Sequence, residues 1–142
     1  MLDDDLIYAR LDGLRQVLGE LREALPEDGD ALAAPENMLK RRAVERCLYL
    51  AIQQVLDVGS HIVAAEGWGL PGSYREVIEK LGDHGVLPRE FARQLAPMAG
   101  FRNILQHDYV ELDLVELDRN ARRFDDFSRF AEFVVVYLQR VS

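Results

Sequence analysis

The chain has 142 residues, a usual length for one domain, and 49% of them are hydrophobic while 30% carry charge. Its formal net charge of −8 argues against a broad nucleic-acid-binding surface, because phosphate contacts need Lys and Arg, but leaves room for a small basic cleft. We therefore expect one globular domain over residues 1–142.

Several features predict a cytoplasmic protein that does not enter a membrane. The sequence contains no run of 18 apolar residues, so we expect no membrane-spanning helix. It begins with the acidic stretch "MLDDDLIYAR", which is unlike the basic start of a signal peptide. Its single cysteine, Cys47, cannot form an internal disulfide.

The first half of the chain predicts two helices separated by a loop. Apolar residues at alternating spacings of four and three mark a helix over about residues 2–25. The stretch "PEDGDALAAP" (26–35) is rich in turn residues and predicts a loop. A long helix over about 36–66 is apolar on more than one side and would be roughly 45 Å long, as suits the centre of a bundle.

The second half predicts three further helices, which makes the chain all-α. Ser73 and Glu76 have the spacing of a capping box, so a short helix should run from there to about Gly82. Pro88 fits the first turn of a fourth helix, which Pro97 should kink or interrupt. After "DYVELDL" (108–114) we expect a single last helix. Its inward residues should be Phe124, Phe127, Ala131, Val134 and Leu138.

Common motifs for cofactors and metals are missing or misplaced. The stretch "GWGLPG" (67–72) matches the spacing of a dinucleotide fingerprint, but it follows a long helix instead of a strand and contains a proline. The sequence has no His-Glu-x-x-His, Cys-x-x-Cys or Glu-x-x-His motif. We therefore expect neither a zinc site nor a carboxylate-bridged di-metal site.

Four other conspicuous residues are predicted to be structural. His61 is expected to be half-buried and hydrogen-bonded to a neighbour, and Cys47 to be a small core residue. His84 follows a predicted helix, whose end it should cap. Trp68 is expected to cover the end of the bundle or to lie at an interface.

The basic stretch "KRRAVER" brings together Lys40, Arg41, Arg42 and Arg46. Such a cluster is typical of a solvated helix face. It would also extend a nucleic-acid-binding track if a site lay beside it.

The segment "RNILQHDY" (102–109) interrupts an apolar pattern with polar residues. The fourth helix's stripe of Phe91, Leu95 and Met98 continues to Arg102, and a guanidinium on an inward stripe is costly unless it is paired. Arg102 and His107 would lie roughly 140° apart on a regular helix. They can meet only if the helix ends here, or if each lines a cleft between two chains.

These residue types allow two readings. Histidine titrates near neutral pH and transfers protons, while arginine binds and stabilises a phosphate, so the pair suits metal-free cleavage of RNA by its own 2′-hydroxyl. An ion pair between arginine and aspartate beside a capping histidine would explain the same residues structurally. The residue types alone leave both readings open.

The motif Arg-Asn-x-Leu-x-His-x-Tyr, preceded by Gly100 and Phe101, resembles the signature of the HepT-like toxins of the HEPN superfamily. The flanking stretches "RRAVERCLYLAIQQVLDVGSHIVAAEG", "SYREVIEKLGDHGVLP" and "VELDLVEL" follow in the order that the family shows. The resemblance implies an antiparallel up-and-down bundle of four to five helices that forms a homodimer. Gln106 stands where many members have an apolar residue.

The resemblance also implies an endoribonuclease toxin that uses no metal and no cofactor. Arg102 and His107 would be catalytic at a cleft between protomers, with Asn103 and Asp108 in supporting roles. Its partners would be RNA and a small nucleotidyltransferase antitoxin of the MntA type, in a homodimer or a larger hetero-oligomer. The antitoxin would use ATP to place AMP on Tyr109. Bulk and negative charge would then block the RNA site.

Two alternatives to the toxin remain. Related bundles act as non-catalytic subunits that present substrate to a partner nucleotidyltransferase, and such a binding module has no need of both Arg102 and His107. A purely structural bundle would not need polar residues on an inward stripe. Toxicity on expression separates a toxin from a binding module.

Overall fold

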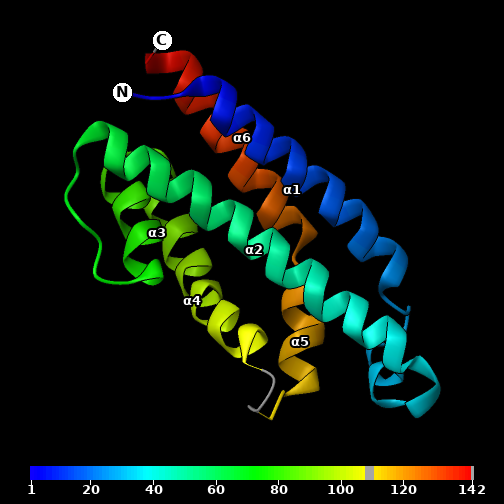
Figure 1. Ribbon diagram of the computed structural model, residues 1–142. Helices are drawn as coiled ribbons and strands as arrows, with labels where there is room; N and C mark the ends of the chain where they lie inside the picture. The colour runs from blue at the N-terminus through cyan, green and yellow to red at the C-terminus, as the bar shows by residue number, and fades with distance from the viewer. Residues whose placement is uncertain (108–110, 142) are drawn as a thin grey trace.

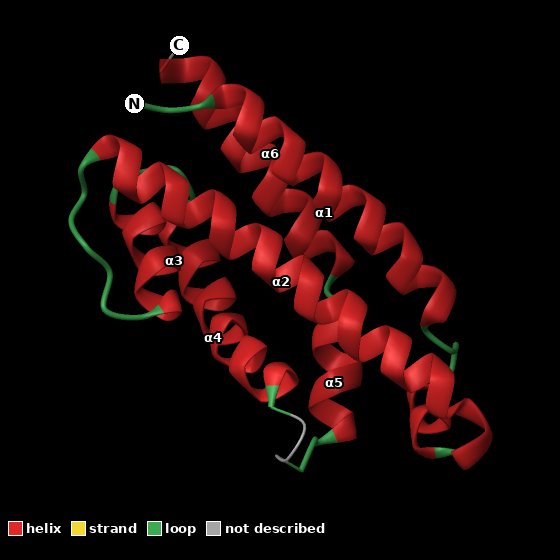
Figure 2. Cartoon of the chain, in the orientation of Figure 1, coloured by secondary structure: helices red, strands yellow, loops and turns green. Residues whose placement is uncertain are grey.

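The computed structural model describes residues 1–107 and 111–141, and within these residues every regular element is a helix. Its helices are α1 (Asp4–Ala24), α2 (Met38–Glu66), α3 (Tyr74–Asp83), α4 (Arg89–Gln106), α5 (Leu114–Ala121) and α6 (Phe124–Val141). Two short 3₁₀ helices, η1 (Gly29–Ala33) and η2 (Pro35–Asn37), precede α2. The prediction of an all-α bundle is confirmed (Figure 2).

The long helix α2 is the centre of the bundle. It packs along α1, which runs antiparallel to it, and also contacts α3, α4, α5 and α6 (Figure 1). This position explains why α2 is apolar on several sides, with buried residues from Val44 to Val63. By length and composition the stretch Pro35–Glu66 could cross a membrane, but 56% of its most apolar window is buried inside the protein, as in a core helix.

The two chain termini lie at the same end of the bundle (Figure 1). The terminal amine donates to the carbonyl of Ala65 at 3.3 Å, and the amide of Asp3 donates to Nε2 of His61 at 3.0 Å. His61 is half-buried and accepts a hydrogen bond from a neighbour, as predicted. Cys47 is buried in the core, as predicted, and burial raises the pKa of its thiol, with a smaller contribution from Glu20.

Aromatic residues close this end of the bundle. Trp68 stacks on His84 with ring centroids 4.1 Å apart, and the edge of Tyr137 approaches Trp68 at 6.2 Å. The hydroxyl of Tyr137 donates to Glu66 at 2.5 Å, and burial followed by this bond raises the pKa of Tyr137 to about 12. Trp68 thus covers the bundle end, and His84 is the residue that ends α3.

The ends of α3 and α4 agree in part with the prediction. The hydroxyl of Ser73 accepts from the amide of Glu76 at 3.2 Å, whereas the carboxylate of Glu76 accepts from Gly72 in place of Ser73. Pro88 directly precedes α4, but Pro97 does not interrupt this helix, which is continuous from Arg89 to Gln106. The packing of Leu95, Met98 and their neighbours in the core outweighs the hydrogen bond that the proline removes.

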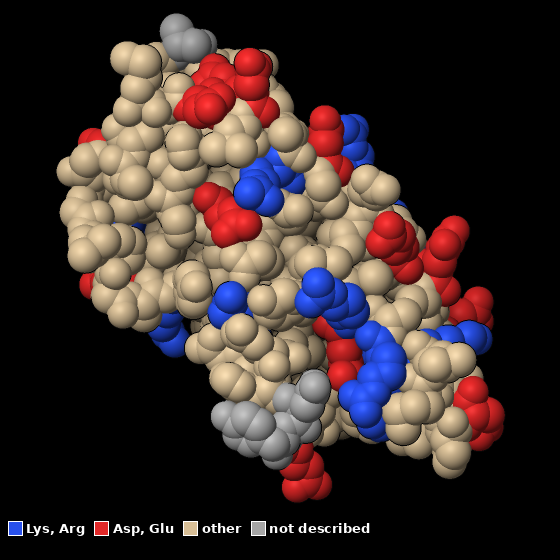
Figure 3. Space-filling view, in the orientation of Figure 1, with Lys and Arg blue, Asp and Glu red and all other residues tan. Residues whose placement is uncertain are grey.

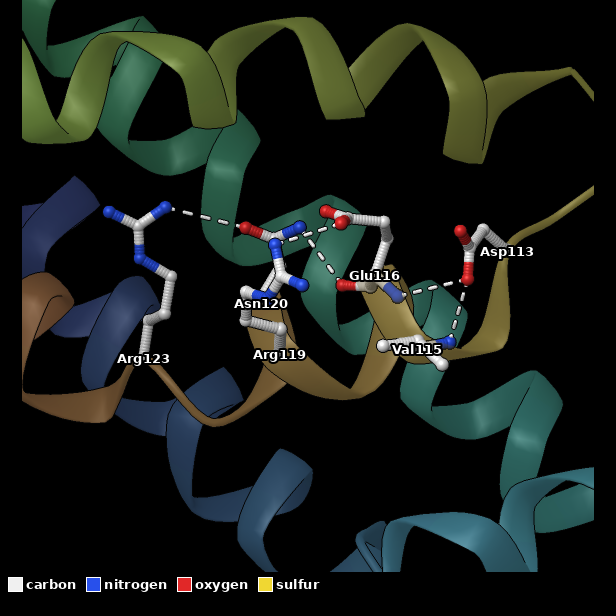
Figure 4. A network of polar contacts seen from close by, with 6 residues as sticks. All are labelled: Asp113, Val115, Glu116, Arg119, Asn120 and Arg123. Carbon is white, nitrogen blue, oxygen red and sulfur yellow. Dashed lines mark hydrogen bonds and ion pairs between the residues drawn. The ribbon is translucent and has the colours of Figure 1, made fainter.

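The prediction of a single last helix is wrong, because α5 and α6 are separate. Asp113 caps α5 by accepting from the amides of Val115 and Glu116 (Figure 4). Asn120, which is only 7% exposed, donates to the carbonyl of Glu116 at 3.0 Å and accepts from Arg123 at 3.3 Å. Such side-chain bonds compete with the helical pattern, so the chain turns after Ala121.

The loop after α1 is held against α5. Arg122 pairs with Asp118 at 2.8 Å and donates to the carbonyl of Pro26 at 2.6 Å. Gly29 packs closely here, because a Cβ at this position would lie 2.5 Å from the carboxylate carbon of Asp118 and would displace that side chain. The expected loop over 26–35 is therefore an ordered segment with a 3₁₀ turn.

The inward face of α6 is also wider than predicted. Phe127, Val134 and Leu138 are buried as expected, while Phe124 and Ala131 are only half-buried. Phe130 and Tyr137, which the prediction omitted, are buried. The buried face of α6 is wide because this helix packs against both α1 and α2.

Candidate active site around Arg102

Arg102 lies in the last turns of α4, where this helix runs antiparallel to α2 (Figure 1). The stripe that leads to it is buried at Phe91, Leu95 and Met98, but Arg102 itself is half-buried. The aliphatic part of the side chain thus covers the core while the guanidinium reaches the surface. The arginine is placed by the same periodicity that buries the rest of the helix.

Four neutral groups accept hydrogen bonds from the guanidinium. Nε donates to Oε1 of Gln53 at 2.5 Å, and Nη1 donates to Oδ1 of Asn103 at 3.2 Å and to Oε1 of Gln106 at 3.1 Å. Nη2 approaches the hydroxyl of Tyr49 at 3.5 Å. These bonds fix the plane of the guanidinium without neutralising its charge.

Two aromatic rings flank the same group. The Cζ atom of Arg102 lies 4.7 Å from the ring centroid of Tyr74, at the start of α3, and 5.4 Å from that of Tyr49, on α2. Cations are attracted to ring faces at such distances. No carboxylate of residues 1–107 or 111–141 is within ion-pair distance of Arg102. Among the described residues, the guanidinium is therefore held by neutral groups and aromatic rings, and none of them neutralises its positive charge.

Gln53 is oriented by its own neighbours. Its Nε2 donates to Oδ1 of Asp57 at 2.7 Å, one turn further along α2, and Asp57 in turn lies 3.8 Å from Nη1 of Arg10 on α1. Because a carboxylate accepts but does not donate, Asp57 requires the amine end of Gln53 to face it. The oxygen end therefore faces Arg102. A chain of contacts thus joins Arg10 to Arg102.

His107 is the residue that ends α4. Its amide donates to the carbonyl of Ile104 at 3.4 Å, its backbone is extended (φ −104°, ψ 102°) and its side chain is exposed. The helix thus ends between Arg102 and His107, which was one of the two conditions under which the pair could meet. Asp108 and Tyr109 lie outside the described residues.

Three residues of this site were not predicted from the sequence: Tyr49, Gln53 and Tyr74. Tyr49 and Gln53 are four residues apart and so lie on one face of α2, where two polar groups between apolar neighbours were the available signal. Tyr74 is brought to the site only by the turn that precedes α3. The site does contain Asn103, and Gln106 binds Arg102 where an apolar residue could not.

Comparison with known proteins agrees with this architecture. The family model described as "Ribonuclease HepT-like" matches residues 14–134. The tRNA nuclease HepT of Aphanizomenon flos-aquae is 33% identical over 110 residues, which cover 76% of this chain and 72% of that protein. The mRNA nuclease HepT of Shewanella oneidensis is 22% identical over 132 residues, which cover 92% and 97% respectively.

A solved structure has the same fold. The tri-AMPylated HEPN toxin of Shewanella oneidensis, in complex with an MNT antitoxin, superposes with a TM-score of 0.81 at 22% identity, covering 96% of this chain and 99% of that one. The extent of the family match and the identity to the Aphanizomenon protein decide the classification. The chain belongs to the HepT-like ribonuclease family.

Proposed function

We propose that this protein is an endoribonuclease toxin of a toxin–antitoxin pair that acts in the cytosol without a metal ion. Family membership supports ribonuclease activity, since two relatives are named as a tRNA nuclease and an mRNA nuclease. The single observation that carries the site is the cluster around Arg102, whose guanidinium contacts only neutral groups and aromatic rings among the described residues.

In the proposed reaction, the RNA supplies the nucleophile. The 2′-hydroxyl oxygen forms a bond to the adjacent phosphorus and the bond from phosphorus to the 5′-oxygen breaks, leaving a 2′,3′-cyclic phosphate and a 5′-hydroxyl. Arg102 binds the phosphate and stabilises the charge that develops on it. His107 acts as general acid or base, transferring a proton to or from the reacting oxygens.

Asn103 and Asp108 support this pair. Asn103 accepts from Nη1 of Arg102 and so limits the rotation of the guanidinium. Asp108 would orient His107 or pair with Arg102. We further propose that the protein is a homodimer whose two copies of Arg102 and His107 line one cleft, where the local positive potential offsets the net charge of −8.

The proposed partner is a nucleotidyltransferase antitoxin that transfers AMP from ATP to Tyr109. The Shewanella toxin, which is tri-AMPylated in its complex with an MNT antitoxin, supports this form of control. Tyr109 is two residues from His107, so an AMP group there would place negative charge and bulk beside the site. RNA and the modified toxin would then repel each other.

Expression in cells tests the toxin against the alternative of a non-catalytic subunit that presents substrate to a nucleotidyltransferase. We expect the wild type to arrest growth and His107→Ala to be tolerated at an equal level of folded protein. Co-expression of a cognate nucleotidyltransferase antitoxin should restore growth. Growth that is unaffected by wild-type protein without AMP would favour the binding subunit.

A further inference from the structure

A second cleft adjoins the Arg102 site. It has a volume of about 580 Å³ and lies between the N-terminal half of α2 and the end of α4, lined by Arg42, Glu45, Arg46, Tyr49, Leu105 and Gln106. Two of these residues, Tyr49 and Gln106, also contact the guanidinium of Arg102. The cleft therefore continues directly from the candidate catalytic arginine.

The ring of Tyr49 contacts an arginine of the cleft, Arg46, as well as Arg102. The Cζ atom of Arg46 lies 5.2 Å from the ring centroid of Tyr49, and that of Arg102 lies 5.4 Å from the same centroid. The two guanidinium carbons are therefore no more than about 11 Å apart. Adjacent phosphates of one nucleic-acid strand lie closer together than this limit, so neighbouring phosphates can reach both arginines.

The arginines in and beside this cleft differ in whether a carboxylate neutralises their charge. Glu45 is half-buried and contacts both Arg41, at 3.4 Å, and Arg42, at 3.1 Å, which leaves this trio with one excess positive charge. Arg46 is exposed, and within the described residues it has no carboxylate at ion-pair distance. Its side chain can therefore exchange water for a phosphate at little cost.

The surface view agrees with this distribution. Lys and Arg side chains gather over the N-terminal half of α2, whereas acidic side chains are prominent along the edge formed by α1 (Figure 3). A concentrated cationic strip on an acidic protein can attract a polyanion locally. Aromatic rings interleaved with cations are typical of grooves for single-stranded nucleic acid.

We propose that Arg46, held by Tyr49, is a second phosphate-binding subsite for single-stranded RNA, taking the phosphate next to the one at Arg102. The inference rests on the proposed function in that it assumes RNA at Arg102. Arg46 contacts no reacting atom in this scheme. It fixes the register of the strand, as phosphate contacts generally do, and Tyr49 positions it through the ring face.

Binding of a short RNA that cannot be cleaved tests this subsite. Wild type, Arg46→Gln, Arg46→Lys and the control Arg129→Gln are titrated with a single-stranded oligonucleotide carrying 2′-O-methyl groups, at several salt concentrations. Arg129 is a matched control because it is an exposed arginine stacked on the rings of Phe91 and Phe133, near the opposite end of α4. Cleavage of the all-ribose oligonucleotide by wild type is measured in parallel.

We expect Arg46→Gln to bind about ten-fold more weakly at low salt. Its slope of log affinity against log salt should be shallower by about 0.7 for each phosphate that the variant no longer neutralises. Arg46→Lys should keep most of that slope, and Arg129→Gln should match the wild type. An Arg46→Gln slope equal to that of wild type, or an equal loss of affinity in Arg129→Gln, would overturn the subsite.

The outcomes separate the subsite from the proposed function. If wild type binds the RNA with the expected Arg46 dependence but does not cleave the all-ribose strand, the nuclease proposal fails and the subsite stands. If wild type cleaves and Arg46→Gln binds as wild type does, only the subsite fails. If wild type neither binds the methylated RNA nor cleaves the all-ribose strand, both proposals fail.

Discussion

Gln53 offers a sharp test of how Arg102 is positioned. Replacing Gln53 with methionine keeps the length and volume of the side chain but removes the acceptor that lies 2.5 Å from Nε of Arg102. The substitution also removes the hydrogen bond that the Gln53 amide donates to Asp57. A hydrogen bond to a charged group contributes about 1.5–3 kcal/mol, so kcat/KM should fall by roughly ten- to a hundred-fold.

The assay is steady-state RNA cleavage at a series of substrate concentrations, so that kcat and KM are obtained separately. Because the charge of Arg102 remains, we expect most of the loss in kcat. The matched control is Gln54→Met, the same change one residue along, where the glutamine lies against Gly13 of α1 and its carbonyl oxygen has no hydrogen-bond partner within the described structure. Wild-type cleavage by Gln53→Met, or an equal loss in Gln54→Met, would refute the positioning role.

Three further predictions concern regulation and stability. Tyr109→Phe should take up no AMP when incubated with the antitoxin and ATP, as measured by intact mass, and should stay active in its presence; AMP on that variant would place the modification elsewhere. Because the pKa of Tyr137 is raised to about 12 in the folded state, its contribution to stability is complete below about pH 10 and is lost as the pH rises towards 12. Tyr137→Phe should flatten the fall in unfolding free energy over that window, and an unchanged slope would contradict the assignment. Burial raises the pKa of the Cys47 thiol, so alkylation at pH 8 should be slow in the folded protein and fast in denaturant, whereas rapid labelling of the native state would show that the thiol is accessible.

The helices could largely be predicted from the sequence because each has a strong apolar stripe. The ranges predicted for α1 and α2 lie within two residues of those observed, and Ser73 correctly marks the start of α3. The break between α5 and α6 could not be predicted, since it depends on bonds made by the side chain of Asn120. Periodicity alone cannot reveal such competition between a side chain and the backbone.

The candidate site likewise contains residues that the sequence predicted and residues that only the structure revealed. Arg102 and Asn103 were found from polar residues that interrupt an apolar stripe, and the structure places them in contact. Tyr49, Gln53 and Tyr74 were missed because they come from α2 and α3, 28 or more positions away in the sequence. The packing of α4 against α2 and α3 brings these three residues to Arg102, and the sequence pattern does not reveal it. Asp108 and Tyr109 stay predictions.

The most direct test of the central claim is cleavage of RNA in excess EDTA by wild-type protein and His107→Ala, with the fragment ends identified. The protein must first be shown by mass to carry no AMP. We predict cuts by wild type only, leaving 2′,3′-cyclic phosphate and 5′-hydroxyl ends. Cleavage that EDTA abolishes, or that His107→Ala retains in full, would contradict the proposed mechanism.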